Sequence, residues 1–331
     1  MNTRERFQTV FNGEKPDRLP VIEFAFWWDK TLENWESQGM PKGLGNLEVF
    51  DYFGLDRHKL FWPAIRAENF PEAPWEGAPV LYNENDYRRL KTMLYSDDRI
   101  RETVRLVEEI RPEHESGETA VWSYLEGFFW YPRTLFGIEN HLMAFYDHPG
   151  LMHEMNSDLA DFNIKLIEAI FNVLKPEFIT FAEDMSYNHG PMVSKEMFDE
   201  FMAPYYRKIV PLIKDCGVKV FIDTDGFVEP MISWFKEVGV EGIAPLERQA
   251  GVDVNRIRAE HPDFLLIGAF DKMTMPKGEC AMREEFERIL PAMKMGRYIP
   301  SVDHQTPPGV SLENYRIYIS LLKEYAEKAV K

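Results

Sequence analysis

The sequence predicts a (β/α)₈ barrel, and three observations indicate this fold. From about residue 118 onward, short apolar runs alternate with segments of helical periodicity, as expected of buried parallel strands joined by helices. Two earlier apolar runs bring the number of strand candidates to the eight that a barrel needs. No GxGxxG motif follows any run, which argues against an open doubly wound sheet, the main alternative.

The strand candidates are all short and apolar. In chain order they are Leu19–Phe26, Lys59–Ala64, Thr119–Leu125, Phe178–Phe181, Val218–Ile222, Val240–Ala244, Phe264–Ala269 and Arg297–Val302. The length of 331 residues fits one such domain, so residues 1–331 are interpreted as a single barrel. Residues 68–98, rich in Pro, Glu and Tyr, are expected to form an insertion loop over the barrel mouth or an interface segment.

Two helices are predicted together with their ends. Ser194 is the expected N-cap of an amphipathic helix that continues to about Ile213, with Pro204 kinking or interrupting it and Gly217 closing it. Ser311 is the expected N-cap of the last helix of the chain.

Composition excludes several classes of protein. The net charge of −17 and pI of about 5.0 disfavour nucleic acid and give no attraction to an anionic membrane. They also disfavour a highly anionic substrate unless arginines gather at the site. With only two cysteines there is no disulfide framework, and a reducing cytoplasm is the expected location. The N-terminus lacks the apolar run of a signal peptide, and no apolar stretch is long enough for a membrane span.

The segment Phe221–Gly226 is the most informative of the sequence, because it ends a predicted buried strand with two carboxylates. Side chains two residues apart on a strand share a face, so Asp223 and Asp225 are expected to point into a common space. Two carboxylates held close together raise the pKa of one of them or bind a cation. A simple strand-ending turn is the alternative interpretation.

Acidic residues follow nearly every predicted strand. In chain order they are Glu23, Glu126, Glu183, Asp184, Asp223, Asp225, Glu247, Asp271 and Asp303. The carboxyl ends of barrel strands carry the reacting groups in this architecture, so these acids predict a polar, acidic cavity there. Such a cavity could hold a metal, a protonated acid catalyst, or a hydroxyl-rich or cationic ligand.

One histidine and several aromatic residues complete the predicted site. His304 follows the last strand beside Asp303, in a loop stiffened by prolines, where it could act as acid, base or ligand. His189 is more simply a loop residue, and the others are expected on helix surfaces or in turns: His58, His114, His141, His148, His153 and His261. The aromatic clusters that contain Trp28 and Trp122 could wall a pocket for a flat or apolar ligand.

Five segments carry a resemblance to a known family. They are Thr3–Pro20, Phe181–Ser194, Gly242–Glu247, Ile267–Lys272 and Pro300–His304. On these segments the chain resembles the uroporphyrinogen decarboxylase superfamily almost from end to end. The resemblance implies a (β/α)₈ barrel, in agreement with the strand count, and a homodimer.

The superfamily contains two chemistries, and this chain departs from the motifs of both. The decarboxylases hold substrate carboxylates with an Arg-Gln-Ala-Gly-Arg-Tyr motif, where this chain has Glu23–Trp28 and no arginine, although His304 matches their C-terminal histidine. The cobamide-dependent methyltransferases bind zinc through a His-x-Cys-Gly segment. Here Asp223 and Asp225 replace both ligands, so an oxygen-rich site is expected instead of a thiol-activating one.

The leading hypothesis is methyl transfer from a methylated small molecule, such as a methoxylated aromatic, to a corrinoid protein (an O-demethylase-like reaction). Asp223, Asp225, Glu183 and His304 are the predicted catalytic group. Asp223, Asp225 and His304 would hold zinc or another divalent cation. The remaining candidates would bind substrate: Glu23, Trp28, Trp122, Glu126, Asp184 and Glu247.

A separate corrinoid protein is expected as partner, because Asp56–Phe61 begins like the corrinoid-binding signature Asp-x-His-x-x-Gly but lacks its glycine. Two alternatives remain open. One is decarboxylation of a porphyrinogen or another carboxylate, with Arg133, Arg248 and Arg297 holding the carboxylates. The other is a non-catalytic barrel that binds a small molecule.

Overall fold

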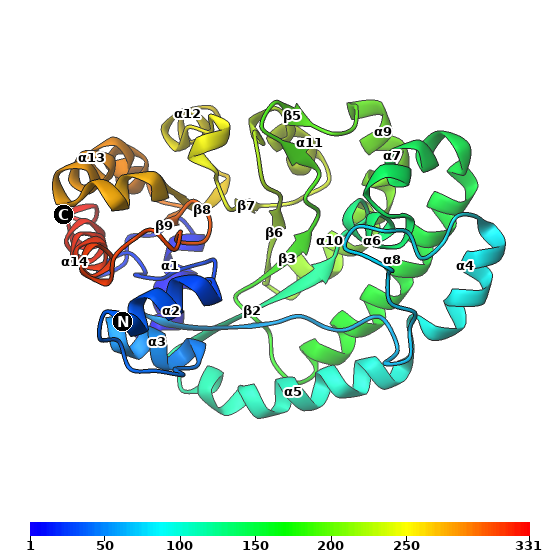
Figure 1. The fold of residues 1–331 in the computed structure, drawn as a ribbon, viewed down its shortest axis with the longest axis horizontal. Coiled ribbons are helices and arrows are strands. Elements are labelled where there is room, and N and C mark those ends of the chain that lie inside the picture. The colour runs from blue at the N-terminus through cyan, green and yellow to red at the C-terminus, as the bar shows by residue number, and fades with distance from the viewer.

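A curled sheet of seven parallel strands lies at the centre of the computed structural model, with helices around it (Figure 1). The strand order is β1-β2-β3-β6-β7-β8-β9, so neighbours in the sheet follow one another along the chain. The strands are β1 (Arg57–Phe61), β2 (Thr119–Glu126), β3 (Phe178–Ala182), β6 (Lys219–Asp223), β7 (Gly242–Ala244), β8 (Leu265–Phe270) and β9 (Tyr298–Val302). A small antiparallel hairpin, β4 (Ser186–Tyr187) and β5 (Gly190–Pro191), lies apart from this sheet.

Helices precede the first strand and connect most of the others. The α-helices are α1 (Thr3–Phe11), α2 (Asp29–Ser37), α3 (Asn46–Phe53), α4 (Glu84–Leu90), α5 (Asp97–Glu115), α6 (Trp130–Phe136), α7 (Ile138–Asp147), α8 (Pro149–Phe171), α9 (Lys195–Phe201), α10 (Ala203–Asp215), α11 (Ile232–Glu237), α12 (Val254–Glu260), α13 (Glu279–Met295) and α14 (Leu312–Lys328). Short 3₁₀ turns are η1 (Lys91–Met93), η2 (Glu229–Met231), η3 (Arg248–Ala250) and η4 (Lys272–Lys277).

The buried apolar residues form one continuous core between the sheet and the helices. Its 98 members run from Phe7 near the N-terminus to Ala326 in α14, so both ends of the chain contribute to the same core. None of the helices combines the length and the apolar character that crossing a lipid bilayer requires. The result is the TIM-barrel-like fold that the sequence predicted.

The prediction of an eighth strand at Leu19–Phe26 was wrong. The segment bonds to residues of β9 and β1, but it bends at residues 24–25 and forms no strand ladder. Pro20 has no N–H to donate, and the Phe24 N–H donates to the Ser301 hydroxyl at 2.9 Å instead of to a neighbouring strand. On the other side, the carbonyl of Glu23 accepts from the His58 ring at 2.8 Å. Side chains therefore replace the ladder bonds at this position of the barrel.

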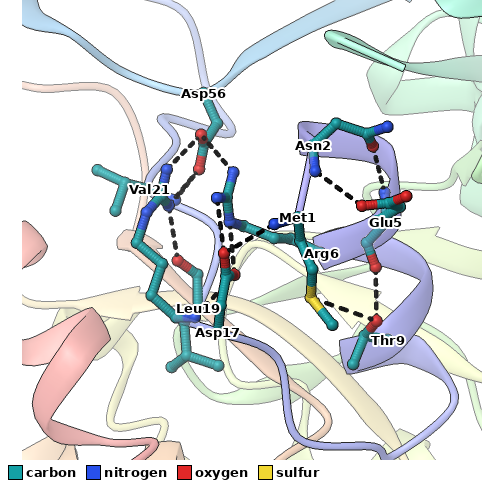
Figure 2. Close-up of polar contacts among 10 residues, drawn as sticks. Met1, Asn2, Glu5, Arg6, Thr9, Asp17, Leu19, Val21 and Asp56 are labelled. Atoms are coloured by element: carbon teal, nitrogen blue, oxygen red, sulfur yellow. Dashed lines mark hydrogen bonds and ion pairs between the residues drawn. The ribbon is translucent and has the colours of Figure 1, made fainter.

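Asp56 connects this segment to β1, as Figure 2 shows. Its carboxylate accepts two hydrogen bonds from the Arg18 guanidinium, at 2.6 and 2.7 Å, and a third from the Val21 N–H at 2.8 Å. The backbone N–H of Asp56 donates to the Val21 carbonyl at 2.8 Å, which completes a two-way link. Nearby, the more exposed Asp17 pairs with Arg6 and the N-terminal ammonium (Figure 2).

The predicted helix ends are confirmed. The Ser194 hydroxyl accepts from the Met197 N–H at the start of α9, and the helix is interrupted at Met202, before Pro204. Gly217 follows α10 with φ +79°, a conformation that glycine adopts without steric cost. Ser311 caps α14 in the same way as Ser194 caps α9. The segment 68–98 is not entirely a loop, because α4, η1 and the first residues of α5 lie within it.

We expect Asp56→Ala to lower the free energy of unfolding by about 2–3 kcal/mol, because it leaves the Arg18 guanidinium and the Val21 N–H without their partner. Asp17→Ala is the matched control: its side chain is 42% exposed, against 8% for Asp56, so its loss should cost less than about 1 kcal/mol. Urea unfolding followed by circular dichroism measures both. Equal losses in the two variants would contradict the assignment of Asp56 as the link.

Candidate active site

The strands end at a common level, which brings the residues after them together. In the parallel register, Glu126 is opposite Ala182, Ala182 is opposite Asp223, and Asp223 is opposite Ala244. The residues that follow these positions therefore lie at the same end of the barrel, here called the mouth, where this architecture carries its reacting groups.

A cavity of about 290 Å³ opens at the mouth. It is lined by Phe24, Ala25, Phe26, Leu60, Trp122, Tyr124, Asp223, Asp225, Pro245, His304 and Gln305. Aromatic rings and two carboxylates dominate this lining, and it contains no lysine or arginine. A second hollow of about 390 Å³, between the end of α1 and the end of α13, lies at the opposite end of the barrel and contains none of the predicted site residues.

Asp225, Glu247 and His304 form a cluster of possible metal ligands at the mouth. Each offers one ligand atom, and the three atoms lie within 4.8 Å of one another; His304 Nε2 is 3.6 Å from Asp225 Oδ2. Burial, and then Glu247 and Asp184, raise the pKa of Asp225 to about 7, although 41% of its side chain is exposed. Burial, and then Lys272, lower the pKa of His304. Asp225 can thus hold a proton near neutral pH while the imidazole is neutral.

Asp223 lines the same cavity but has a different partner. Its carboxylate accepts a hydrogen bond from the Tyr124 hydroxyl on β2. Burial raises the pKa of Asp223 to about 8; the Tyr124 hydrogen bond opposes this rise, and the negative charge of Asp225 adds to it. The structure therefore brings Asp225 and His304 together with Glu247, and it places Asp223 beside Tyr124 outside this cluster of possible metal ligands.

The loop that carries Asp225 is held by close backbone packing at Gly226. This glycine has φ +85°, and a Cβ atom there would lie 2.6 Å from the backbone of Tyr187 in the β4–β5 hairpin. Its N–H donates to Glu247 Oε2 at 3.1 Å, which orients the Glu247 carboxylate beside Asp225. Any side chain at position 226 would displace the hairpin or the loop.

Glu183 does not line the cavity. It is fully buried, and its carboxylate accepts from the N–H groups that begin α6, those of Phe128, Phe129 and Trp130, and from the Tyr206 hydroxyl. Burial raises the pKa of Glu183 to about 8, against the effect of the N–H donors. The structure thus gives this side chain the position of a helix cap.

The other predicted acids are distributed around the site. Asp184 pairs with Arg133, whose Nη1 lies 2.8 Å from its Oδ2. Glu23 is buried behind the cavity and accepts from Tyr318 at 2.8 Å; burial raises its pKa to about 8. Burial also raises the pKa of Glu126 to about 7, although the positive charge of Arg66 opposes this rise. Glu126 does not line the cavity. Asp303 accepts from the N–H groups of Arg248 and Lys272 and so connects two mouth loops.

The two predicted tryptophans differ in their positions. Trp122 lines the cavity, whereas Trp28 is 44% exposed and borders an open hollow beside it, shared with Gln305. Tyr124 and Lys272 were missed as site residues. Tyr124 lies two positions before Glu126, on the same face of its strand, and lines the cavity. Lys272 Nζ lies 3.5 Å from Glu247 and 3.7 Å from Asp303.

Three histidines predicted on surfaces or in turns are buried, which corrects that expectation: His58, His114 and His141. His58 matters for the site, because its Nδ1 accepts from the Trp122 indole N–H at 3.0 Å while its Nε2 donates to Glu23 O. Burial lowers the pKa of His58 to about 4, so it stays neutral and orients Trp122.

The arginines proposed to hold substrate carboxylates do not line the cavity. Arg133 is paired with Asp184, and Arg248 bonds to the Val252 carbonyl. Arg297 precedes β9 and bonds to Phe11 and Asn12 carbonyls at the opposite end of the barrel. Nothing in the lining thus replaces the guanidinium groups that a polyanionic substrate needs.

The uroporphyrinogen decarboxylase (URO-D) family model matches residues 69–325, well over half of the chain. The chain belongs to the uroporphyrinogen decarboxylase family. A uroporphyrinogen decarboxylase of Nautilia profundicola is 26% identical over 144 residues, which are 42% of this chain and only 40% of that protein. A methyltransferase from Methanosarcina mazei has a similar fold, with a TM-score of 0.66 at 15% identity over 98% of this chain and 99% of the other.

We expect the stability that Glu23 contributes to decrease between about pH 4.5 and pH 8, since the folded state keeps its carboxyl protonated longer than the unfolded chain does. Relative to Glu23→Gln, the wild type should therefore lose up to a few kcal/mol of unfolding free energy from pH 5 to pH 8. Urea unfolding at both pH values measures this difference. A constant difference between the two proteins would contradict a protonated Glu23, and the exposed Glu33→Gln is the control.

Proposed function

We propose that this protein is a methyltransferase that moves a methyl group from a methylated small molecule to a corrinoid held by a separate protein. The observation that carries the proposal is the mouth cavity, where Asp225 and His304, clustered with Glu247, meet aromatic walls and the lining contains no lysine or arginine. The resemblance to the methyltransferase branch of the superfamily and the fold shared with the Methanosarcina mazei methyltransferase support it.

The corrinoid is assigned to a partner because the segment resembling a corrinoid signature is occupied with other contacts. Asp56 bonds to Arg18 and Val21, and His58 is buried against Trp122 and Glu23, so neither is available to a cofactor. These residues do not fit a corrinoid. A reduced corrinoid brought by the partner would supply the nucleophile that takes the methyl group.

The residues of this chain would act on the atom that loses the methyl group. When that atom is an ether oxygen, the electron pair of the broken C–O bond stays on it, and the alkoxide or phenolate needs a proton. Asp225, with its pKa raised to about 7, can deliver one at neutral pH. Trp122 and Phe26 would flank the rest of the donor, and a methoxylated aromatic ring suits such walls.

A divalent cation is a second way to assist the leaving atom. The oxygen, oxygen and nitrogen atoms of Asp225, Glu247 and His304 fit the donor preference of zinc and similar ions. A bound ion would supply Lewis acidity. Lys272, 3.5 Å from Glu247, neutralises part of the same charge and would have to withdraw from that carboxylate.

Two other functions are weaker. Family membership favours decarboxylation, but the cavity lining has no arginine for a polycarboxylate. A barrel that only binds a ligand needs no group that titrates near neutral pH. Asp225 at the mouth is such a group, which favours catalysis.

We expect Asp225→Asn to reduce methyl transfer by 100-fold or more with purified protein, a methyl ether as donor and reduced corrinoid protein, because the amide cannot deliver the proton. The wild-type rate on an ether should fall as the pH rises above about 7, where Asp225 loses its proton. Methylated corrinoid is followed by its absorbance.

Glu33→Gln is the matched control for the loss of one acid, because Glu33 lies on α2 in the neighbouring open hollow and outside the cavity lining. It should leave the rate unchanged. Transfer from no donor, together with loss of carboxyl groups from uroporphyrinogen in the same preparation, would reverse the order of the two hypotheses.

We also expect Glu247→Gln and His304→Ala each to lower the affinity of the protein for Zn²⁺ by at least tenfold, since each removes one of three ligands. Calorimetric titration of metal-free protein with zinc measures this. Unchanged zinc affinity in both variants would show that the ion binds elsewhere or not at all, and would leave proton delivery as the remaining route.

A further inference from the structure

We propose that the mouth cavity binds an organic cation, a methylated ammonium group, with its charge beside Asp223 and Asp225 and its methyl groups against the aromatic walls. This inference deepens the proposed function because it names the chemical class of the methyl donor. It rests on the proposed function only for the later transfer of the methyl group. The binding itself depends on the cavity alone.

The rings of the cavity form two walls that meet at an angle. Phe24 stacks on Trp122 with ring centroids 4.8 Å apart and planes 24° apart, which makes one wall. Tyr124 lies edge-on to Trp122 at 5.0 Å and 62°, which makes the second wall. Phe26 also lines the cavity. Rings set at an angle around one space can present several negative ring faces to one quaternary ammonium group, which attracts it.

The charges around the cavity select the same class of ligand. Asp223 and Asp225 both line it beside His304, and the lining contains no lysine or arginine; Arg133 pairs with Asp184, and Lys272 with Glu247 and Asp303. A ligand with a fixed positive charge would supply the missing counterion, whereas a carboxylate or phosphate would add to the repulsion.

The size of the cavity also favours a small head group. About 290 Å³ lies at the lower end of the usual range for ligand pockets, which excludes a macrocycle from full burial. An ammonium donor also simplifies the chemistry. When the C–N bond breaks, the electron pair stays on nitrogen and the amine leaves neutral, so no proton is needed and the carboxylates serve only as counterions.

The test compares choline with 3,3-dimethylbutan-1-ol, its neutral carbon isostere, by calorimetric titration of metal-free wild-type protein. We expect choline to bind at least tenfold more tightly. Asp223→Asn and Asp225→Asn should each reduce this preference severalfold, and Phe26→Leu should weaken choline about threefold or more with little effect on the alcohol. Glu33→Gln, which removes an acid outside the lining, should change neither affinity.

Equal binding of choline and the alcohol to the wild type, or no choline binding at millimolar concentration, would overturn the inference without any variant. Choline binding that survives both aspartate substitutions in folded protein, checked by circular dichroism, would also overturn it. Failure of the proposed function is distinguishable: choline would then bind, yet no methylated donor would transfer its methyl group to reduced corrinoid protein. Demethylation of an ether without choline binding would leave the function standing and remove the inference.

Discussion

The burial of many carboxylates at one end of the sheet, with few cations beside them, is the constraint on which the site depends. An ionised carboxylate is costly to remove from water unless donors or opposite charges compensate. Most of the acids find such partners: Glu183 accepts the N–H groups that begin α6, Asp303 two loop N–H groups, and Asp184 the Arg133 guanidinium. Asp223 has only a tyrosine hydroxyl, and Asp225 has a neutral imidazole at 3.6 Å.

This division separates acids that build the mouth from acids that face its cavity. The compensated carboxylates hold loops and the start of a helix in place. Their oxygen atoms already accept hydrogen bonds or ion pairs from the protein. Asp223 and Asp225 face open space, where a proton, a metal ion or a cationic ligand can compensate their charge. The net charge of the whole chain is −17, so its long-range field does not stabilise the charges of these carboxylates.

The sequence was sufficient to place seven strands, two helix caps and the end of the barrel that carries the acids, because each follows from local pattern. It was not sufficient for Leu19–Phe26, whose apolar residues fit a strand but whose backbone bonds go to side chains far along the chain, such as Ser301. Nor could it say which acids face the cavity. Glu183 and Asp223 both follow or end a strand, yet one caps a helix and the other lines the pocket.

Long-range placement also explains the errors with basic residues. Arg297 and His304 are separated by only one strand in sequence, but β9 carries them to opposite ends of the barrel, so closeness along the chain misled the assignment of Arg297. His58 was expected at the surface and is buried instead, because the Trp122 indole and the Glu23 carbonyl satisfy both of its nitrogens. Neither partner can be identified from local sequence.

The segment Leu19–Phe26, which takes the place of an eighth strand, determines when the barrel can close during synthesis of the chain. Two of its N–H groups bond far along the chain, that of Phe24 to Ser301 and that of Leu19 to the Ala326 carbonyl, and the adjoining Trp27 bonds to the Tyr315 hydroxyl. The residues of this segment must therefore wait for partners that are synthesised much later. The barrel can close only after those partners have left the ribosome, and until then the growing chain carries an open sheet edge.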